Sequence, residues 1–131
     1  MTAKKKLGIG LDVLLTASQG QYDTKPEESI LTRAEELFAR ALEQDEMGDS
    51  FAAYYFYRQV IDLLDTKDPD TPEISELISR SCNNIAVILF ENDQTEKAMG
   101  FFQQAIEIYP QNRTVVENMK LLKMDTDNVH S

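Results

Sequence analysis

Residues 79–112, SRSCNNIAVILFENDQTEKAMGFFQQAIEIYPQN, contain two apolar runs that are separated by a short polar segment. In the second run Ala98, Phe102 and Ala105 recur at intervals of four and three, which places them on one face of a helix. The same periodicity in the first run is carried by Cys82, Ile85, Ala86 and Leu89. The stretch therefore predicts two helices, and the short turn between them implies that they are antiparallel neighbours.

The ends of the second helix are marked by polar residues and a proline. Asp93 with Glu96 three residues later is similar to a capping box, which predicts the start of the helix. Pro110 predicts its end, because proline cannot continue a helix. Ala86 and Ala98 are small enough to let the two helices of the hairpin approach each other closely.

This stretch resembles a tetratricopeptide repeat, a helical hairpin of about 34 residues with small and large residues at fixed sites. The residues that stand at those sites are Cys82, Ile85, Ala86, Leu89, Ala98, Phe102, Ala105 and Pro110. The resemblance implies a protein-binding scaffold that has no chemistry of its own and binds partners on the first helix of each hairpin.

The preceding residues, 27–66, predict another helical hairpin that fits the repeat less closely. Gly48, Ala53 and Tyr57 suit its second helix, but Arg40 stands where an apolar residue is expected. The two hairpins are also 45 residues apart from Ala53 to the matching alanine, about 11 more than a tandem array shows. Residues 27–66 are therefore either a divergent repeat or a hairpin similar to the microtubule-interacting-and-trafficking unit.

The fold class that the pattern predicts is all-α, with stacked antiparallel hairpins. Five helices are expected, at about 27–47, 50–66, 73–91, 94–109 and 113–124. Thr71 and Asn112 are expected to cap the third and the fifth of them. The predicted organisation is a flexible segment and linker at 1–26, a helical domain at 27–124 (27–66 divergent hairpin, 73–110 repeat hairpin, 112–124 capping helix) and a frayed tail at 125–131.

Four consecutive aromatic residues, Tyr54 to Tyr57, lie in the second predicted helix. They cannot all face inward at 100° per residue, so Tyr55 or Phe56 is expected to meet solvent, another helix or a partner. The apolar residues expected on the buried stripe of this helix are Phe51, Ala53, Tyr54, Tyr57, Val60, Ile61 and Leu64.

A protein-binding groove follows from the repeat resemblance, position by position. The residues that it places in the groove are Phe38, Leu42, Arg80, Asn83, Asn84, Val87 and Phe90. Arg80 with the two asparagines is suited to a peptide carboxylate or backbone. The alternative for Phe38, Leu42 and Phe90 is packing between hairpins.

The charge and the single cysteine limit which partners and which cellular compartment are expected. The 131 residues have a net charge of −10, of which residues 27–131 carry −12 and residues 1–26 carry +2. An acidic body is repelled by phosphate backbones, so a nucleic-acid partner is not expected. The single cysteine, Cys82, suits a reducing compartment, and we expect a cytoplasmic protein.

The sequence offers no set of residues for catalysis, metal binding or a cofactor. His130 is the only histidine and lies at the end of the chain, so a nucleophile would lack a base. No cysteine–histidine cluster has metal-ligand spacing. An enzyme is therefore not expected.

The N-terminal segment, KKKLGIGLDVLL at residues 4–15, is basic and apolar, with Asp12 interrupting any signal-peptide core. It resembles the extreme N-terminus of ParB-type chromosome-partition proteins, which docks on a ParA-type Walker ATPase, although Ile9 replaces the usual basic residue. The resemblance implies such an ATPase as a partner of this segment. Its predicted docking residues are Lys4, Lys5, Lys6, Leu7, Leu11, Leu14 and Leu15.

Three functional hypotheses follow. The first is a bacterial adaptor that binds one protein through the groove and another, such as a ParA/MinD-like ATPase, through the N-terminal segment. The second is a chaperone-like holder of a secreted or assembling subunit. The third is a peripheral membrane protein, in which three lysines contribute about 3 kcal/mol at an anionic surface while the acidic body opposes binding.

Overall fold

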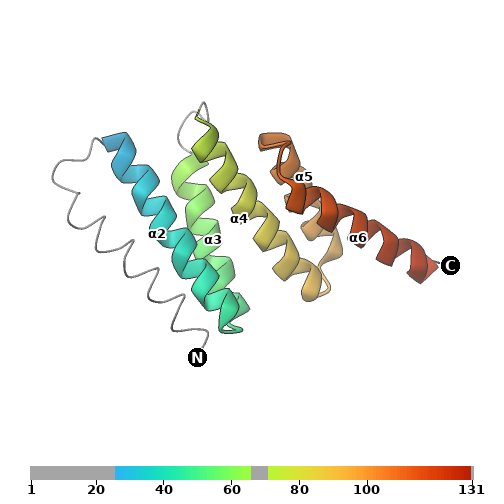
Figure 1. Ribbon diagram of the computed structural model, residues 1–131. Coiled ribbons are helices and arrows are strands. Elements are labelled where there is room, and N and C mark those ends of the chain that lie inside the picture. The colour runs from blue at the N-terminus through green and yellow to red at the C-terminus, as the bar shows by residue number, and fades with distance from the viewer. Residues whose placement is uncertain (1–25, 66–70, 131) are drawn as a thin grey trace. The chain divides into compact units, whose positions relative to one another are not determined.

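The computed structural model describes residues 26–65 and 71–130 of the chain, and the predicted N-terminal docking segment lies outside them. The described residues form five helices and no strand, which confirms the all-α prediction (Figure 1). The chain divides into two compact units, Met1–Asp70 and Thr71–Ser131. The helices are α2 (Pro26–Glu46) and α3 (Ser50–Asp65) in the first unit, and α4 (Pro72–Glu91), α5 (Thr95–Ile108) and α6 (Arg113–His130) in the second.

The first unit is an antiparallel hairpin whose turn is set by Gly48. Its φ of +88° lies in the left-handed region, where glycine has no steric cost. The amide of Gly48 donates to the Asp45 carbonyl at 3.1 Å, and that of Asp49 donates to the Gln44 carbonyl at 2.9 Å, which is a Schellman motif. The Asp49 carboxylate then accepts a hydrogen bond from the Ala52 amide at 3.0 Å and so caps α3.

Small residues and one aromatic pair fill the space between α2 and α3. Ala41 and Ala53 are fully buried, so the two backbones approach closely. The rings of Phe38 and Tyr57 pack with their centroids 5.7 Å apart. The Tyr57 hydroxyl donates to Asp45 Oδ2 at 3.1 Å, which joins the end of α2 to the middle of α3.

The expected buried stripe of α3 is wrong at its first residue. Phe51 is 87% exposed, whereas Ala53, Tyr57 and Val60 are fully buried. Phe51 lies two positions before Ala53, and two steps of 100° turn its side chain to the opposite face. Of the four consecutive aromatics, Tyr55 is the exposed one, as the geometry of a single helix required.

The second unit begins with the α4–α5 hairpin, whose turn differs from the prediction. Asp93 does not cap α5; it ends α4, with a φ of +64°. The Asp93 amide donates to the Phe90 carbonyl at 3.1 Å and the Gln94 amide to the Leu89 carbonyl at 2.9 Å. This is the Schellman pattern of the Gly48 turn, so an aspartate here occupies the position that a glycine occupies there. The predicted capping box at the start of α5 is wrong. Aspartate suits both an N-cap and a left-handed turn, so the residue type alone does not distinguish the two.

The core positions of the two hairpins correspond at an interval of 45 residues. Six of the eight buried apolar positions of the first hairpin have a buried counterpart 45 residues later in the second, and the counterparts of Ile61 and Leu64 are half-buried. The matched pairs include Ala34 with Ser79, Ala41 with Ala86, Ala53 with Ala98, Tyr57 with Phe102, and Val60 with Ala105. The first hairpin therefore has the packing plan of the second, although Arg40 and Gln44 depart from the repeat's sequence pattern.

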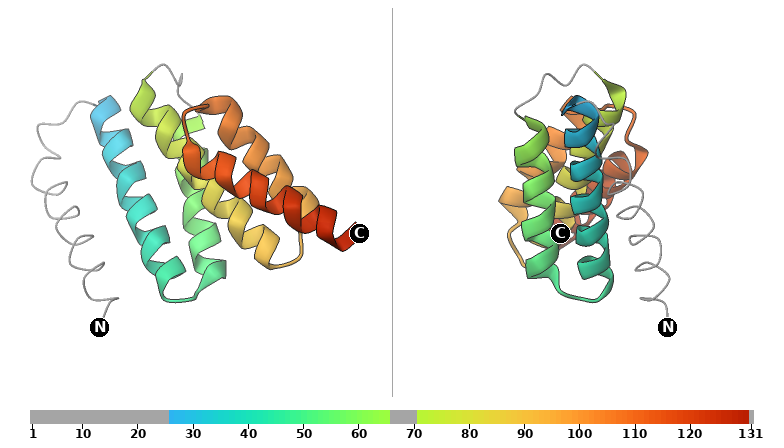
Figure 2. Two further views of the ribbon diagram at one scale, coloured as in Figure 1. Left: turned by 45° about the vertical axis from the view of Figure 1, so that its right-hand side comes forward. Right: turned by 90° about the vertical axis from the view of Figure 1, so that its left-hand side faces the viewer.

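The last helix, α6, crosses the α4–α5 pair obliquely and projects beyond it (Figures 1 and 2). Asn112 caps it as predicted, because its Oδ1 accepts from the Val115 amide at 3.3 Å. The helix continues to His130, so the expected end at Met124 is wrong. No proline or glycine lies between Arg113 and His130 to end it.

Candidate protein-binding groove of the second unit

All three helices of the second unit line one open pocket of about 360 Å³. Val87, Phe90 and Glu91 come from α4, and Phe102 comes from α5. The third wall is α6, which contributes the buried Leu122, the half-buried Asn118 and the exposed Leu121. Figure 2 shows that α6 crosses the α4–α5 hairpin obliquely, and the pocket is lined by residues of all three of these helices.

Two polar contacts hold α6 in this position against α4. The Asn112 Nδ2 group donates to Ser79 Oγ at 2.9 Å, and Ser79 in turn donates to the Ala105 carbonyl at 2.8 Å. One turn beyond Ser79 on α4, Asn83 Oδ1 accepts a hydrogen bond from Asn118 Nδ2 at 2.9 Å. Ser79 is fully buried, so its bonds are made away from water, where breaking one is costly.

The pocket is suited to an apolar side chain of a bound peptide, whose polar backbone would lie beside it. Its lining is mainly aliphatic and aromatic, and Leu121 is 62% exposed although it is a large apolar residue. Glu91 and Asn118 supply hydrogen-bonding groups at the margin. A cleft with apolar walls and a few polar groups is the usual form of a peptide-binding site.

The predicted groove residues of α4 fall into two groups. Val87 and Phe90 are half-buried and both line the pocket. Arg80 is exposed and Asn84 half-buried, and the helical spacing places them on the same face of α4 as Val87. These four residues together form a stripe that runs from the middle of α4 into the pocket.

Asn83 is buried and bonded to other side chains of its own unit, so it does not face an open groove. It is only 5% exposed, its Oδ1 accepts from Asn118, and its Nδ2 donates to Asn84 Oδ1 at 3.1 Å. In the other unit Phe38 is buried against Tyr57 and Leu42 is half-buried. Neither is brought into the pocket, which belongs to the second unit alone. The seven N-terminal docking residues lie outside the described residues.

Sequence reasoning missed the contribution of α6. Asn118, Leu121 and Leu122 were not singled out, and the fifth helix was expected only to cap the hairpin. The signal that existed was the spacing of Asn118 and Leu122, four residues apart on one face of a helix. That spacing says which residues share a face, but the crossing angle decides whether the face closes a pocket.

The comparison with protein families decides what the hairpin is. Residues 79–112 match the family model of the tetratricopeptide repeat. This stretch, about a quarter of the chain, is similar to a tetratricopeptide repeat. The matched residues begin within α4 and end at Asn112, so the repeat contains the α4–α5 turn and all of α5, and α6 follows it. A search of the curated proteins finds no match to this chain.

Proteins with this repeat are generally interaction modules that bind other proteins. Within the described ranges there is no cluster of three or more histidine, cysteine, aspartate or glutamate residues that could hold a metal ion. None of the helices in those ranges is long and apolar enough to cross a membrane.

Proposed function

We propose that the protein is a non-enzymatic adaptor whose tetratricopeptide repeat holds a short apolar segment of a partner protein in the α4–α6 pocket. The observation that carries this proposal is the exposed Leu121 side chain facing a pocket that Val87 and Phe90 also line. An apolar pocket left open on a repeat hairpin is the surface on which such modules bind peptides.

The stripe of α4 extends the site beyond the pocket. Arg80 and Asn84 provide donors for a carboxylate or a backbone carbonyl of the bound segment, while Val87 and Phe90 contact its apolar side chains. The partner is therefore a protein segment with one or two large apolar residues and an acidic or C-terminal group beside them. In this proposal residues 27–124 are the binding body and residues 1–26 a separate docking segment.

The test compares two variants in co-purification of the full chain from cells of its source. Leu121→Asp puts a charge into the pocket, and Met99→Asp puts the same charge on an exposed apolar residue of α5 that does not line the pocket. We expect a partner that wild type and Met99→Asp retain and that Leu121→Asp loses, with equal melting temperatures. Retention of every partner by Leu121→Asp would contradict the proposal.

We further propose that residues 4–15 dock on a ParA/MinD-like ATPase, which makes the protein a bridge in a bacterial cytoplasm. The support is the sequence resemblance to the N-terminus of ParB-type proteins, together with the three lysines and the spaced leucines. Replacing Leu11 and Leu14 by serine should release such an ATPase and leave the pocket-bound partner in place. If an ATPase remains bound to this variant, or none is found with wild type, the proposal is wrong.

The two other hypotheses are separated by the same experiments. A holder of secreted or assembling subunits would retain several unrelated apolar segments in the pocket instead of one partner. A peripheral membrane protein would float with anionic vesicles at low salt and lose them at high salt, because three lysines supply most of the attraction.

A further inference from the structure

The turn of the first hairpin exposes three large apolar side chains, which we call the turn patch: Met47, Phe51 and Tyr55. Their exposed fractions are 59%, 87% and 59%. Phe51 and Tyr55 are four residues apart on α3 and therefore neighbours on one face of the helix. The patch lies in a different unit from the α4–α6 pocket and plays no part in the proposed function above.

The patch is held on a rigid frame. The Schellman motif at Gly48 and the cap at Asp49 fix the start of α3, on which Phe51 is the second residue. Tyr55 packs on Phe56 with ring centroids 5.8 Å apart, so the exposed ring is supported from one side. A preorganised aromatic surface binds a ligand with little loss of conformational freedom.

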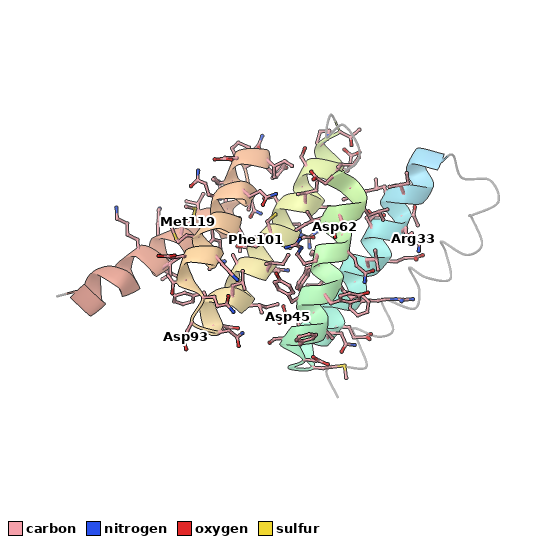
Figure 3. All side chains as sticks on the ribbon, turned by 180° about the vertical axis from the view of Figure 1, so that it is seen from behind. Arg33, Asp45, Asp62, Asp93, Phe101 and Met119 are labelled. Carbon is pink, nitrogen blue, oxygen red and sulfur yellow. The ribbon has the colours of Figure 1, made fainter. Side chains whose placement is uncertain are left out.

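The sequence around the patch is acidic. Residues 43–57 contain four acidic residues and no basic residue. These are Glu43, Asp45, Glu46 and Asp49, and Figure 3 labels Asp45 beside the turn. The nearest basic residue on the same face of α3 is Arg58, one turn beyond Tyr55. The described hairpin, residues 26–65, has ten acidic and three basic residues and so a net charge of −7.

This charge selects among the possible occupants. A second copy of the hairpin would bring two acidic turns together, which like-charge repulsion opposes. An acidic lipid or nucleic-acid surface is opposed for the same reason. A segment with a cluster of lysines followed by leucines satisfies both the carboxylates and the aromatic rings.

We propose that the turn patch binds residues 4–15 of the same chain. Lys4, Lys5 and Lys6 meet the carboxylates of the turn, and Leu7 and Leu11 cover the exposed rings. The chain supplies this chemistry only once: outside residues 4–6 no two of its basic residues are adjacent in sequence.

The length of the chain permits this contact. α2 has 21 residues and so separates its first residue from the turn by about 30 Å. Between Leu11 and Pro26 stand residues 12–25, and a chain of that length spans about 46–50 Å when extended and about 20 Å as a coil. The segment therefore reaches the patch without being fully stretched, and the tether gives it an effective concentration of about millimolar order.

Docking in this way regulates the segment. While residues 4–15 cover the turn patch they are not free to bind another protein, so a partner of the segment must compete with the patch. The patch then sets how tightly a partner must bind to open the chain, independently of what the α4–α6 pocket holds.

The test places a nitroxide label at position 3, through Ala3→Cys, in the isotope-labelled full chain. Cys82 is fully buried, so under native conditions the label attaches at position 3, and labelled wild type controls for this. We expect the NMR signals of Phe51 and Tyr55 to be broadened and those of Met99, an exposed residue of the other unit, to be unaffected. Unbroadened Phe51 and Tyr55 signals would overturn the proposal.

Further comparisons assign the cause of the broadening. Charge reversal of Lys4, Lys5 and Lys6 to glutamate should abolish the broadening, and 1 M salt should reduce it because the Debye length falls to about 3 Å. Phe51→Ser should abolish it, while the matched Met99→Ser should not. A mixture of isotope-labelled chains without nitroxide and unlabelled chains with it tests the intramolecular contact, and broadening at Phe51 there would overturn it.

Discussion

Asn112 is the residue whose replacement tests the second unit most sharply, because one side chain makes two different bonds. Its Oδ1 accepts from the Val115 amide and caps α6, and its Nδ2 donates to the buried Ser79 hydroxyl. Losing an N-cap costs about 1 kcal/mol. Losing the bond to Ser79 costs about 1 kcal/mol more. Asn112→Ala is therefore expected to lower the free energy of unfolding by about 2 kcal/mol.

Asn112→Asp separates the two bonds. The carboxylate still accepts from the Val115 amide, and the start of a helix favours a negative charge, but it cannot donate to Ser79. We expect a loss of about 1 kcal/mol for this variant, half of that for alanine. Ser79→Ala combined with Asn112→Ala should reveal a coupling energy of about 1 kcal/mol between the two side chains.

Urea unfolding followed by circular dichroism measures the loss, and amide hydrogen exchange locates it. With a slope of about 2 kcal/mol per molar urea, Asn112→Ala should lower the midpoint by about 1 M. The Val115 amide should exchange faster in Asn112→Ala and remain protected in Asn112→Asp. Equal midpoints for wild type and Asn112→Ala, with Val115 unchanged, would refute the role given to this side chain.

Three further predictions concern the turns, the first hairpin and pH. Gly48→Ala should lower the free energy of unfolding by about 1 kcal/mol through backbone strain alone, because the added Cβ meets nothing within 4 Å, whereas Asp93→Gly should not lower it; denaturant midpoints of both would decide. Tyr57→Phe should cost about 0.5–1.5 kcal/mol by removing the bond to Asp45, and an unchanged midpoint would show that the bond adds nothing. Burial raises the pKa of the Glu35 carboxyl above its ordinary value of 4.5, so the ionised group opposes folding at higher pH. Glu35→Gln should therefore leave the melting temperature unchanged at pH 3 and raise it slightly at pH 7, an increase limited by solvent screening; a decrease at pH 7 would contradict the assignment.

The sequence was sufficient to predict the features that depend on local spacing. The boundaries of α2 to α5 lie within two residues of their predicted ends, and the cap at Asn112 was read correctly, because periodicity and breakers act over a few residues. The family model confirms the resemblance of the stretch from Ser79 to Asn112 to a tetratricopeptide repeat. Val87 and Phe90 were placed on the groove by that resemblance, and both line the pocket, although their contact with a partner stays a prediction.

The features that depend on tertiary geometry could not be predicted. Leu121 lines the pocket only because α6 crosses α4 and α5 obliquely, and no pattern in the sequence gives that angle. An asparagine at position 83 suits either a bound peptide or a bond to Asn118. Only the structure shows that Asn118 is its partner. Phe51 was assigned to the core on its hydrophobicity, although its spacing from Ala53 already placed it on the other face.

The central claim is that the α4–α6 pocket holds a segment of a partner protein, and site-specific photo-crosslinking in living cells tests it most directly. A photoreactive residue at position 121 lies in the pocket, and one at position 99 lies on an exposed part of α5 outside it. The account predicts that a single protein is crosslinked from position 121 and is not crosslinked from position 99. Crosslinking of the same proteins from both positions, or of none from position 121, would contradict it.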